Sequence, residues 1–575
     1  MTNRRLAILS RAFFERFFAS ESVTSDIQLR QTQIWVLAFL LTPGLVLLIQ
    51  LLPQYQFVVI RAARMHSPGM VDDMLIWIAF IFVTYSIVTV GLITVFVWDA
   101  LSFDHRDAMT LGPLPIGGRT IVGAKLAALG GFLLAAALPM DLLNAALFAL
   151  VTSDRFGSGV LIWNFVALLS STVTAAAFVF ALLVTTRGGA MLAAGPRVAA
   201  GMGSVLQFLF VVALLSLVFL SPALIKVRSG ILDNPDAVGW LPTSWFLGLF
   251  EQLRGSTRVY FVGFANRALV ATLAALAAAV VVSLLGYRRQ MQFALSRPSR
   301  GHAAPILQTV RWLARTLAGR NPVARATSDF VLLTLARNRS QQTPVAMNAA
   351  LGCAMALVAL TRAKTLDALM QPRTIVLWIP LLVGYWLTIG LRASAFVPSE
   401  LPAAWTFRTS APTGTRAYWA GTRAAFVALV IPLVALVAIA VTVPLIGWRF
   451  ALRHAAFAAL VITIVIDVVM LTLRYIPFTT PYLPGHARLK TRWPLYFFGM
   501  WAVAYWPVRL ELLLNNGGER VLFAAALVCA IGFYALGRRT APRWSVEPRQ
   551  EFADDGWDLA VLDIGRVVHG AHVGG

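Results

Sequence analysis

The stretch MLIWIAFIFVTYSIVTVGLITVFV, residues 74–97, contains no charged side chain. Its apolar residues fill every turn instead of alternating with polar ones, which predicts a helix that is apolar all round and not a β-strand. About 20 such residues are enough to cross a bilayer. A helix also satisfies its own backbone hydrogen bonds in hydrocarbon. This stretch therefore predicts a membrane-spanning helix.

Similar runs on both sides of this stretch predict an all-α, polytopic transmembrane bundle of about twelve spans. The composition agrees, because 59% of the 575 residues are hydrophobic and 13% are charged, against about 25% charged in soluble domains. The expected spans are Trp35–Leu52, Met74–Val97, Ile121–Val151, Gly159–Thr185, Val205–Ile225, Phe261–Leu285, Pro344–Leu360, Thr374–Ala393, Ala417–Val443, Phe450–Leu473, Leu495–Leu514 and Val521–Leu536.

The basic residues predict the orientation and the domain boundaries. Lys and Arg exceed Asp and Glu by 23, and most of them lie in the loops on the side of the two termini. By the positive-inside rule both termini are cytoplasmic, and anionic lipid, not nucleic acid, accounts for the charge. We expect an amphipathic N-terminal segment (1–34), a first membrane half (35–286), a basic cytoplasmic linker with a second amphipathic segment (287–343), a second half (344–537) and a cytoplasmic tail (538–575).

The two halves resemble each other in sequence. The loop between the second and third spans reads Pro115-Ile116-Gly117-Gly118-Arg119 in the first half and Pro412-Thr413-Gly414-Thr415-Arg416 in the second. Both are Pro-x-Gly-x-Arg, which predicts an internal duplication. Six spans in each half keep the halves parallel, an arrangement found in transporters.

The first of these loops resembles a known family. The stretch DAMTLGPLP, residues 107–115, followed by Arg119, Ile121 and Lys125, is similar to the loop before the third span of bacterial ABC-2-type permeases. The resemblance implies a permease subunit of an ATP-driven transporter in the bacterial inner membrane, and an exporter. It also implies coupling loops that dock an ABC-type ATP-binding subunit, formed here by Asp107, Pro115, Gly117 and Arg119 and by Arg408, Pro412, Gly414 and Arg416.

The chain departs from the family in two ways. The usual permease has six spans, so twelve imply two fused halves and room for two copies of the ATPase. In the second half Ala411-Pro412 replaces Leu114-Pro115, and Arg423 lies near the position of Lys125. The docking role of the second loop therefore rests on a weaker match than that of the first.

The sequence contains no recognisable catalytic or cofactor motif. The nearest approach to a Walker A loop, Gly118 to Lys125, has Ala124 where Lys is required. Metalloprotease, serine-hydrolase and Cys/His ligand spacings do not occur, and Cys353 and Cys529 lie in different spans. We therefore expect no enzyme, metal or cofactor in this chain, with ATP and Mg²⁺ held by the partner.

Two carboxylates inside expected spans are candidates for a translocation path. Asp141 lies in the third span and Asp467 in the tenth, where a charge costs roughly 3 kcal/mol unless it faces a cavity or a partner. They predict either a path for substrate or protons, or hydrogen bonds that pack helices. Two alternatives to the ATP-driven permease stay open: a gradient-driven secondary transporter of twelve spans, and a membrane assembly factor that transports nothing.

Overall fold

The computed structural model is helical and consists of two compact units, Met1–Gly301 and His302–Gly575. The division falls within the segment 287–343. In the described part of the chain every regular element is a helix, which confirms the polytopic helical bundle. The structure describes residues 2–18, 49, 51, 53–66, 69–98, 100–101, 103, 105–153, 158–193, 195–220, 238–256, 258–295, 305–363, 372–399, 416–473, 476–479, 489–513 and 518–540.

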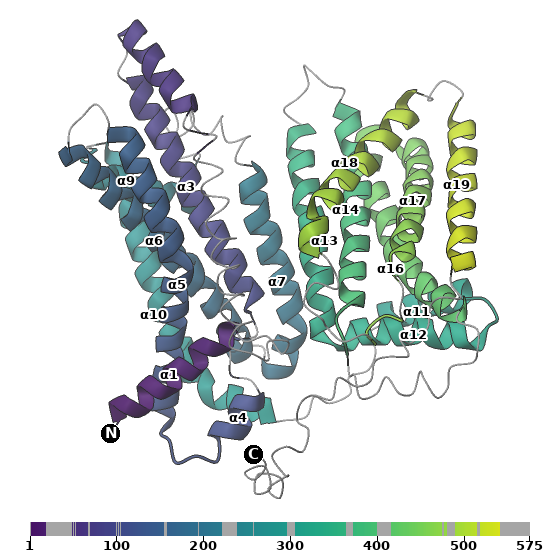
Figure 1. Ribbon diagram of the computed structural model, residues 1–575, viewed down its shortest axis with the longest axis horizontal. Helices are drawn as coiled ribbons and strands as arrows, with labels where there is room; N and C mark the ends of the chain where they lie inside the picture. The colour runs from purple at the N-terminus through teal and green to yellow at the C-terminus, as the bar shows by residue number, and fades with distance from the viewer. Residues whose placement is uncertain are drawn as a thin grey trace, which may run out of the picture. The chain divides into compact units, whose positions relative to one another are not determined.

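Unit 1 is built around α3 (Gly69–Phe96), which has 72% of its most apolar window buried. This helix packs against α5, α6, α7 and α9, while α10 packs against α6 and α9. Figure 1 shows α1 and α4 near one end of this bundle and α9 near the other. Unit 1 also contains α1 (Thr2–Phe18), α4 (His105–Leu111), α5 (Gly118–Ser153), α6 (Ser158–Ala193), α7 (Gly195–Leu220), α9 (Pro242–Leu253) and α10 (Val259–Leu295), and residues 53–65 are helical as well.

Unit 2 is built around α14 (Pro372–Ala395), whose most apolar window is 94% buried. It packs against α13, α16, α17 and α18, and α19 covers α17. The helices α11 and α12 lie across one end of this bundle and pack on α16 (Figure 1). The other helices of unit 2 are α11 (Pro305–Leu317), α12 (Pro322–Arg337), α13 (Arg339–Ala363), α16 (Arg416–Ile446), α17 (Trp448–Leu471), α18 (Leu489–Leu513) and α19 (Glu519–Thr540).

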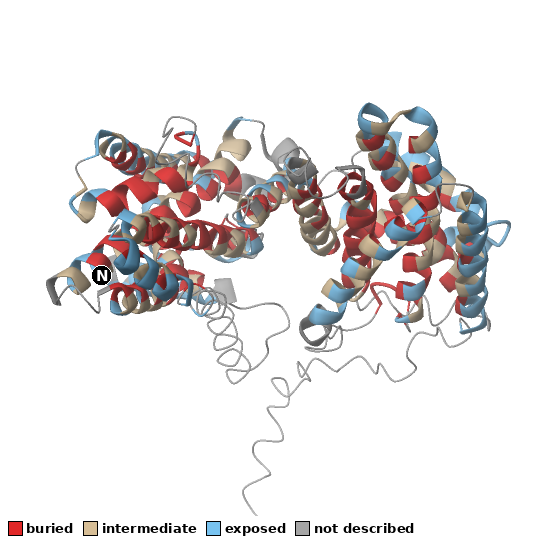
Figure 2. Ribbon diagram, turned by 90° about the horizontal axis from the view of Figure 1, so that it is seen from above, coloured by how far each residue is buried: buried red, intermediate tan, exposed pale blue. Residues whose placement is uncertain are grey.

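Each unit has its own core of apolar side chains. The core of unit 1 includes Phe80, Phe148 and Phe250, and that of unit 2 includes Trp386 and Phe426. In Figure 2 the buried residues of each unit lie where helices face one another, and exposed residues lie on the outer faces. Lipid is as apolar as these side chains, so close packing rather than escape from water holds such helices together.

Ten helices of the described part are long and apolar enough to cross a membrane. They correspond to ten of the twelve expected spans. The expected span Trp35–Leu52 lies almost entirely outside the described residues. The expected span Leu495–Leu514 forms α18, but Trp, Tyr and Pro replace aliphatic residues there and the helix is not among the ten.

The two units repeat one packing pattern. The helices α3, α5 and α6 of unit 1 contact each other, as do α14, α16 and α17 of unit 2. An amphipathic helix packs on the third span in both cases, α1 on α5 and α12 on α16. Unit 1 has α9 between α7 and α10. The corresponding connection in unit 2, between α18 and α19, consists of residues 514–518 and is too short for such a helix. An internal duplication, as expected from the two Pro-x-Gly-x-Arg loops, would give this order of contacts and stays a prediction.

Candidate functional site

The loop that follows the central helix of unit 1 begins at a fully buried tryptophan, Trp98. The guanidinium carbon of Arg187, from α6, lies 5.3 Å from the centre of the Trp98 ring. The side chain of Gln207, from α7, donates a hydrogen bond of 3.2 Å to the Val95 carbonyl oxygen in the last turn of α3. Two helices distant in sequence therefore fix the point where α3 ends.

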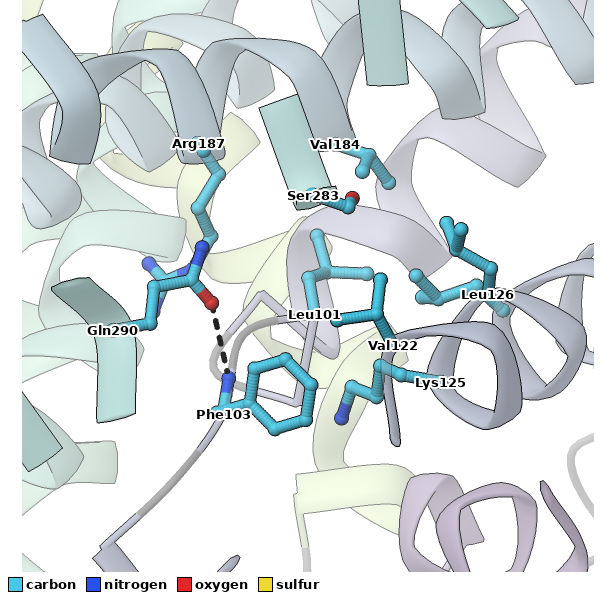
Figure 3. A pocket seen from close by; sticks show the side chains of 11 residues that line it. Leu101, Phe103, Val122, Lys125, Leu126, Val184, Arg187, Ser283 and Gln290 are labelled. Carbon is cyan, nitrogen blue, oxygen red and sulfur yellow. Dashed lines mark hydrogen bonds between the residues drawn. The ribbon is translucent and has the colours of Figure 1, made fainter. Parts of the chain in front are cut away.

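Phe103 attaches the next part of this loop to three more helices. Its ring meets the Phe13 ring of α1 edge-on at 6.0 Å and the Tyr287 ring of α10 at 5.3 Å. The ammonium nitrogen of Lys125, from α5, lies 5.7 Å from the centre of the same ring. The backbone N–H of Phe103 donates a long hydrogen bond, 3.5 Å, to Gln290 Oε1, drawn in Figure 3.

A small cavity separates the two cations of this region. Lys125 of α5 and Arg187 of α6 line it together with Ser283 and Gln290 of α10, and Figure 3 shows these side chains around the loop. Its volume of about 20 Å³ is enough for one water molecule. We therefore interpret this cavity as a packing defect between the loop and the helices that hold it, and not as a binding site for a transported solute.

The short helix α4 turns one face inward and the other outward. Asp107 is 2% exposed, whereas Met109 is 58% exposed and Leu114, in the turn after α4, is 48% exposed. The backbone of this turn is closed by hydrogen bonds from Gly112 N to the Ala108 carbonyl and from Leu114 N to the Leu111 carbonyl. An apolar tip therefore projects from a loop that is attached to five helices at its base.

The structure separates the residues expected to couple the loop to a partner. Pro115, Gly117 and Arg119 are exposed, but Asp107 is buried. In the second half Arg416 begins α16 and is exposed. The remaining expected coupling residues, Arg408, Pro412 and Gly414, lie outside the described part of the chain.

The end of the central helix of unit 2 is also held by distant residues. The Gln341 amide at the start of α13 donates a 2.9 Å hydrogen bond to the Pro398 carbonyl, and Ser394 Oγ donates one of 2.8 Å to the Gln341 carbonyl. The backbone N–H of Phe478 donates to the Ala395 carbonyl at 2.9 Å. In both units, therefore, the chain that leaves the central helix is fixed to its neighbours.

The two candidate path carboxylates have different surroundings. Asp141 is 1% exposed among α3, α5 and α6, and Ser86 Oγ donates a hydrogen bond of 3.1 Å to its Oδ2. Its Oδ1 makes no hydrogen bond among the described residues. Asp467 is fully buried and accepts hydrogen bonds from both Nε and Nη2 of Arg423, at 2.6 and 3.0 Å. Neither of these carboxylates lines the cavity near Lys125.

The described residues contain no group of three or more His, Cys, Asp or Glu side chains that could hold a metal ion. Cys353 and Cys529 are separate free thiols. Among the described residues, His454 of α17 and Glu511 of α18 form a buried pair, with 2.9 Å between His454 Nδ1 and Glu511 Oε2. Two ligands of this kind are too few for a zinc site.

Sequence reasoning named Lys125 only as part of the family resemblance and missed the other residues that hold the loop. Gln207 carries a signal in the sequence, since it is an amide within an apolar helix, where polar side chains bond across helices. Arg187 has a comparable signal as a cation near the end of an expected span. Gln290 follows Arg288 and Arg289 in a polar stretch and carries no such signal. Their common target is visible only once the helices are packed.

Comparison with known proteins gives no match, whether with family models, curated sequences or solved structures. The function of this chain is therefore inferred from its own residues.

Proposed function

We propose that this chain is the membrane-spanning permease subunit of an ATP-driven exporter in a bacterial inner membrane. A separate ABC-type ATP-binding subunit, in two copies, docks on its cytoplasmic loops and supplies ATP and Mg²⁺. The observation that carries the proposal is the loop after α3, which projects Met109 and Leu114 outward while its base is fixed to the bundle through Trp98 and Phe103.

An exposed apolar tip on a firmly held loop suits the transmission of force. The partner covers Met109 and Leu114, which removes two large apolar side chains from water. When ATP closes the partner, displacement of the tip moves Phe103 against α1, α5 and α10, and Trp98 against α6. A rigid-body movement of helices follows, as in other domain transitions.

The buried position of Asp107 changes which residues are expected to bind the partner. A carboxylate that is 2% exposed supports α4 from inside instead of meeting a second protein. Docking is therefore assigned to Met109, Leu114 and Arg119. Arg119 is exposed at the start of α5 and offers a charge five residues after Leu114 in the sequence.

The experiment is affinity purification from mild detergent in the native host, with mass spectrometry of the chains that co-purify. We expect a stoichiometric ATP-binding subunit with the wild-type chain and its loss with Met109→Asp/Leu114→Asp. The matched control is Val259→Asp, because Val259 is 85% exposed at the start of α10, away from the loop. A wild-type chain that purifies alone from several detergents, or equal loss in the control, would overturn the proposal.

One observation favours a second function, gradient-driven transport. Asp141 has one carboxylate oxygen without a hydrogen bond among the described residues, at a position well inside an apolar helix. Such an intramembrane carboxyl group is a candidate proton carrier. Uptake by liposomes that contain only this chain, driven by a proton gradient and lost in Asp141→Asn, would favour this function over the ATP-driven one.

A further inference from the structure

A histidine and a glutamate meet inside unit 2. His454 is fully buried in the second turn of α17, and Glu511, in the last turn of α18, is 5% exposed. The Nδ1 atom of His454 lies 2.9 Å from Oε2 and 3.1 Å from Oε1 of Glu511. One ring nitrogen therefore faces both oxygens of a carboxyl group, and a single proton can be held between the two side chains.

The helices around this pair give Glu511 no second counter-ion. The helix α17 packs against α14, α16 and α19, and α18 packs against α14 and α19. Residues 374–391 of α14 and 424–446 of α16 contain no charged side chain. Among the described residues, His454 is the one ion-pair partner of Glu511.

The other charged groups near these helix ends are held elsewhere. They lie in the first two turns of α14, α17 and α19 and in the last two turns of α18: Arg373, Arg449, Arg453, Arg509, Glu519 and Arg520. Arg453 pairs with Glu519 at 2.6 Å, and Arg509 donates a hydrogen bond of 3.3 Å to the Tyr505 hydroxyl. The arginines of α17, α18 and α19 in this set are exposed. Asp467, farther along α17, is bound by Arg423.

A count of the protons on the pair gives two states. With one proton, neutral imidazole donates Nδ1–H to the carboxylate and the pair has one negative charge. With a second proton the pair is neutral overall, either as imidazolium beside carboxylate or as imidazole beside a carboxylic acid. A buried negative charge without a counter-ion is costly, so the apolar surroundings favour the state with the second proton.

The second ring nitrogen differs between these states. His454 Nε2 is shielded from solvent and has no hydrogen-bond partner among the described residues. It has a bare lone pair in the anionic state and carries a hydrogen in both forms of the neutral state. Because Nε2 has no partner in either state, its hydrogen bonding does not select between them, and the charge of the pair does. The Phe450 ring lies nearly parallel to the imidazole, with the ring centres 6.3 Å apart.

We propose that His454 and Glu511 form a proton-binding site that takes up one proton when the external solution becomes acidic. A hydronium ion donates the proton and leaves as water, and the new bond is O–H on Glu511 or N–H on His454. Glu511 is the point of entry, because it is the less buried of the two and lies at the end of α18 that the charge pattern predicts to be external. The site requires neither ATP nor a transported solute, so this proposal does not rest on the proposed permease function.

The test follows the nitrogen-15 NMR signals of the histidine side chains in the full chain, labelled at its seven His and reconstituted in phosphatidylcholine bilayers. These signals distinguish a bare nitrogen from an N–H, and the signals missing in His454→Gln belong to His454. We expect Nε2 of His454 to change from a bare nitrogen at about pH 8 to an N–H at about pH 5, the range in which histidine pairs titrate. Glu511→Gln should abolish this change, because an amide neither takes up a proton nor balances an imidazolium.

The matched control is Glu519→Gln, because Glu519 pairs with Arg453, the residue before His454 in α17. This variant should keep the change at Nε2, and thermal unfolding of each variant shows that the fold is retained. An Nε2 signal of the wild type that is the same at both pH values would overturn the proposal without the need for any variant. Persistence of the change in Glu511→Gln, or its equal loss in Glu519→Gln, would also overturn it. No ATPase is present in this measurement, so its failure is distinguishable from a failure of the permease to bind its partner.

Discussion

The ammonium nitrogen of Lys125 lies 4.9 Å from the centre of the Phe13 ring, so a cation of α5 holds the amphipathic helix α1 against the bundle. The same nitrogen is 5.7 Å from the ring centre of Phe103, in the loop that carries α4. One side chain thereby connects the loop, α1 and the third span. Movement of the loop is transmitted to α5 through this contact.

Substitution of Lys125 tests that connection. In Lys125→Met the apolar stem remains and the cation is lost, which removes cation–π contacts worth about 0.5–2 kcal/mol. We expect the exposed tip to keep binding the partner while stimulation of the partner's ATPase by the permease falls severalfold. Co-purification and ATP hydrolysis measured on the same preparation separate the two effects. Lys125→Arg should retain most of the stimulation, and full stimulation in Lys125→Met would contradict the role given to the cation.

The buried ion pair of unit 2 predicts an asymmetry between single and double variants. Asp467 is fully buried and accepts two hydrogen bonds from Arg423, whose guanidinium carbon also lies 4.5 Å from the centre of the Tyr534 ring. Asp467→Asn leaves the Arg423 cation without its counter-ion and should destabilise unit 2 by about 3–5 kcal/mol. The double variant Arg423→Met/Asp467→Leu removes both charges and should lie closer to the wild type.

Thermal unfolding of the purified chain in one detergent measures both variants. Asp141→Asn is the control, because Asp141 has a hydroxyl partner and not a cation, and an amide can keep that hydrogen bond. If Asp467→Asn and the double variant unfold at the same temperature as the wild type, the pair contributes nothing to stability.

The sequence was sufficient to predict the membrane-spanning helices but not which helices and loops pack against one another. Continuous apolar runs predicted the ten long apolar helices of the described part, because each span satisfies its backbone locally and the signal lies within about 20 neighbouring residues. The contact of Gln290 with Phe103 joins residues 187 positions apart and leaves no local pattern. The burial of Asp107 has the same origin, since α4 packs on α10, a helix far along the chain. The helices α11 and α12 were expected only as one amphipathic segment, because the basic residues of the linker interrupt the apolar pattern.

The hairpin of α11 and α12 is held by a carboxylate between two arginines. Asp329 Oδ1 is 2.9 Å from Arg311 Nε, and its Oδ2 accepts a hydrogen bond of 2.9 Å from Arg315 Nε. Partial burial raises the pKa of Asp329, but the two guanidinium groups outweigh this and hold the pKa below its usual value of 3.8. The pair therefore stabilises the hairpin above about pH 4.

This stabilisation is expected to disappear as the pH falls through the lowered pKa of Asp329. Hydrogen–deuterium exchange of the α11 amides, corrected for intrinsic rates, should show protection at pH 7 that decreases as the pH falls below about 4. Asp329→Asn should show the reduced protection throughout this pH range. Glu15→Gln, which breaks an exposed pair with Arg11 in unit 1, is the control and should leave α11 unchanged. Equal protection of α11 in Asp329→Asn and the wild type at pH 7 would contradict this account.

Gly421 sets how closely α12 approaches α16. A Cβ atom added at Gly421 would collide with the Ala324 carbonyl oxygen and lie 2.7 Å from Thr327 Cβ, both on α12. These are backbone and inner side-chain atoms that cannot rotate away, so Gly421→Ala should push α12 outward and cost about 1–3 kcal/mol. Gly532 of α19 is the matched control, because a Cβ there would meet no atom within 4 Å. Gly532→Ala should be neutral or stabilising, since Ala favours the helix by up to about 1 kcal/mol. Thermal unfolding of both variants, with proteolysis at the basic residues of α12, measures the difference in their stability. Equal stability and equal proteolysis of the two variants would show that the contact between α12 and α16 is looser than the packing of Gly421 implies.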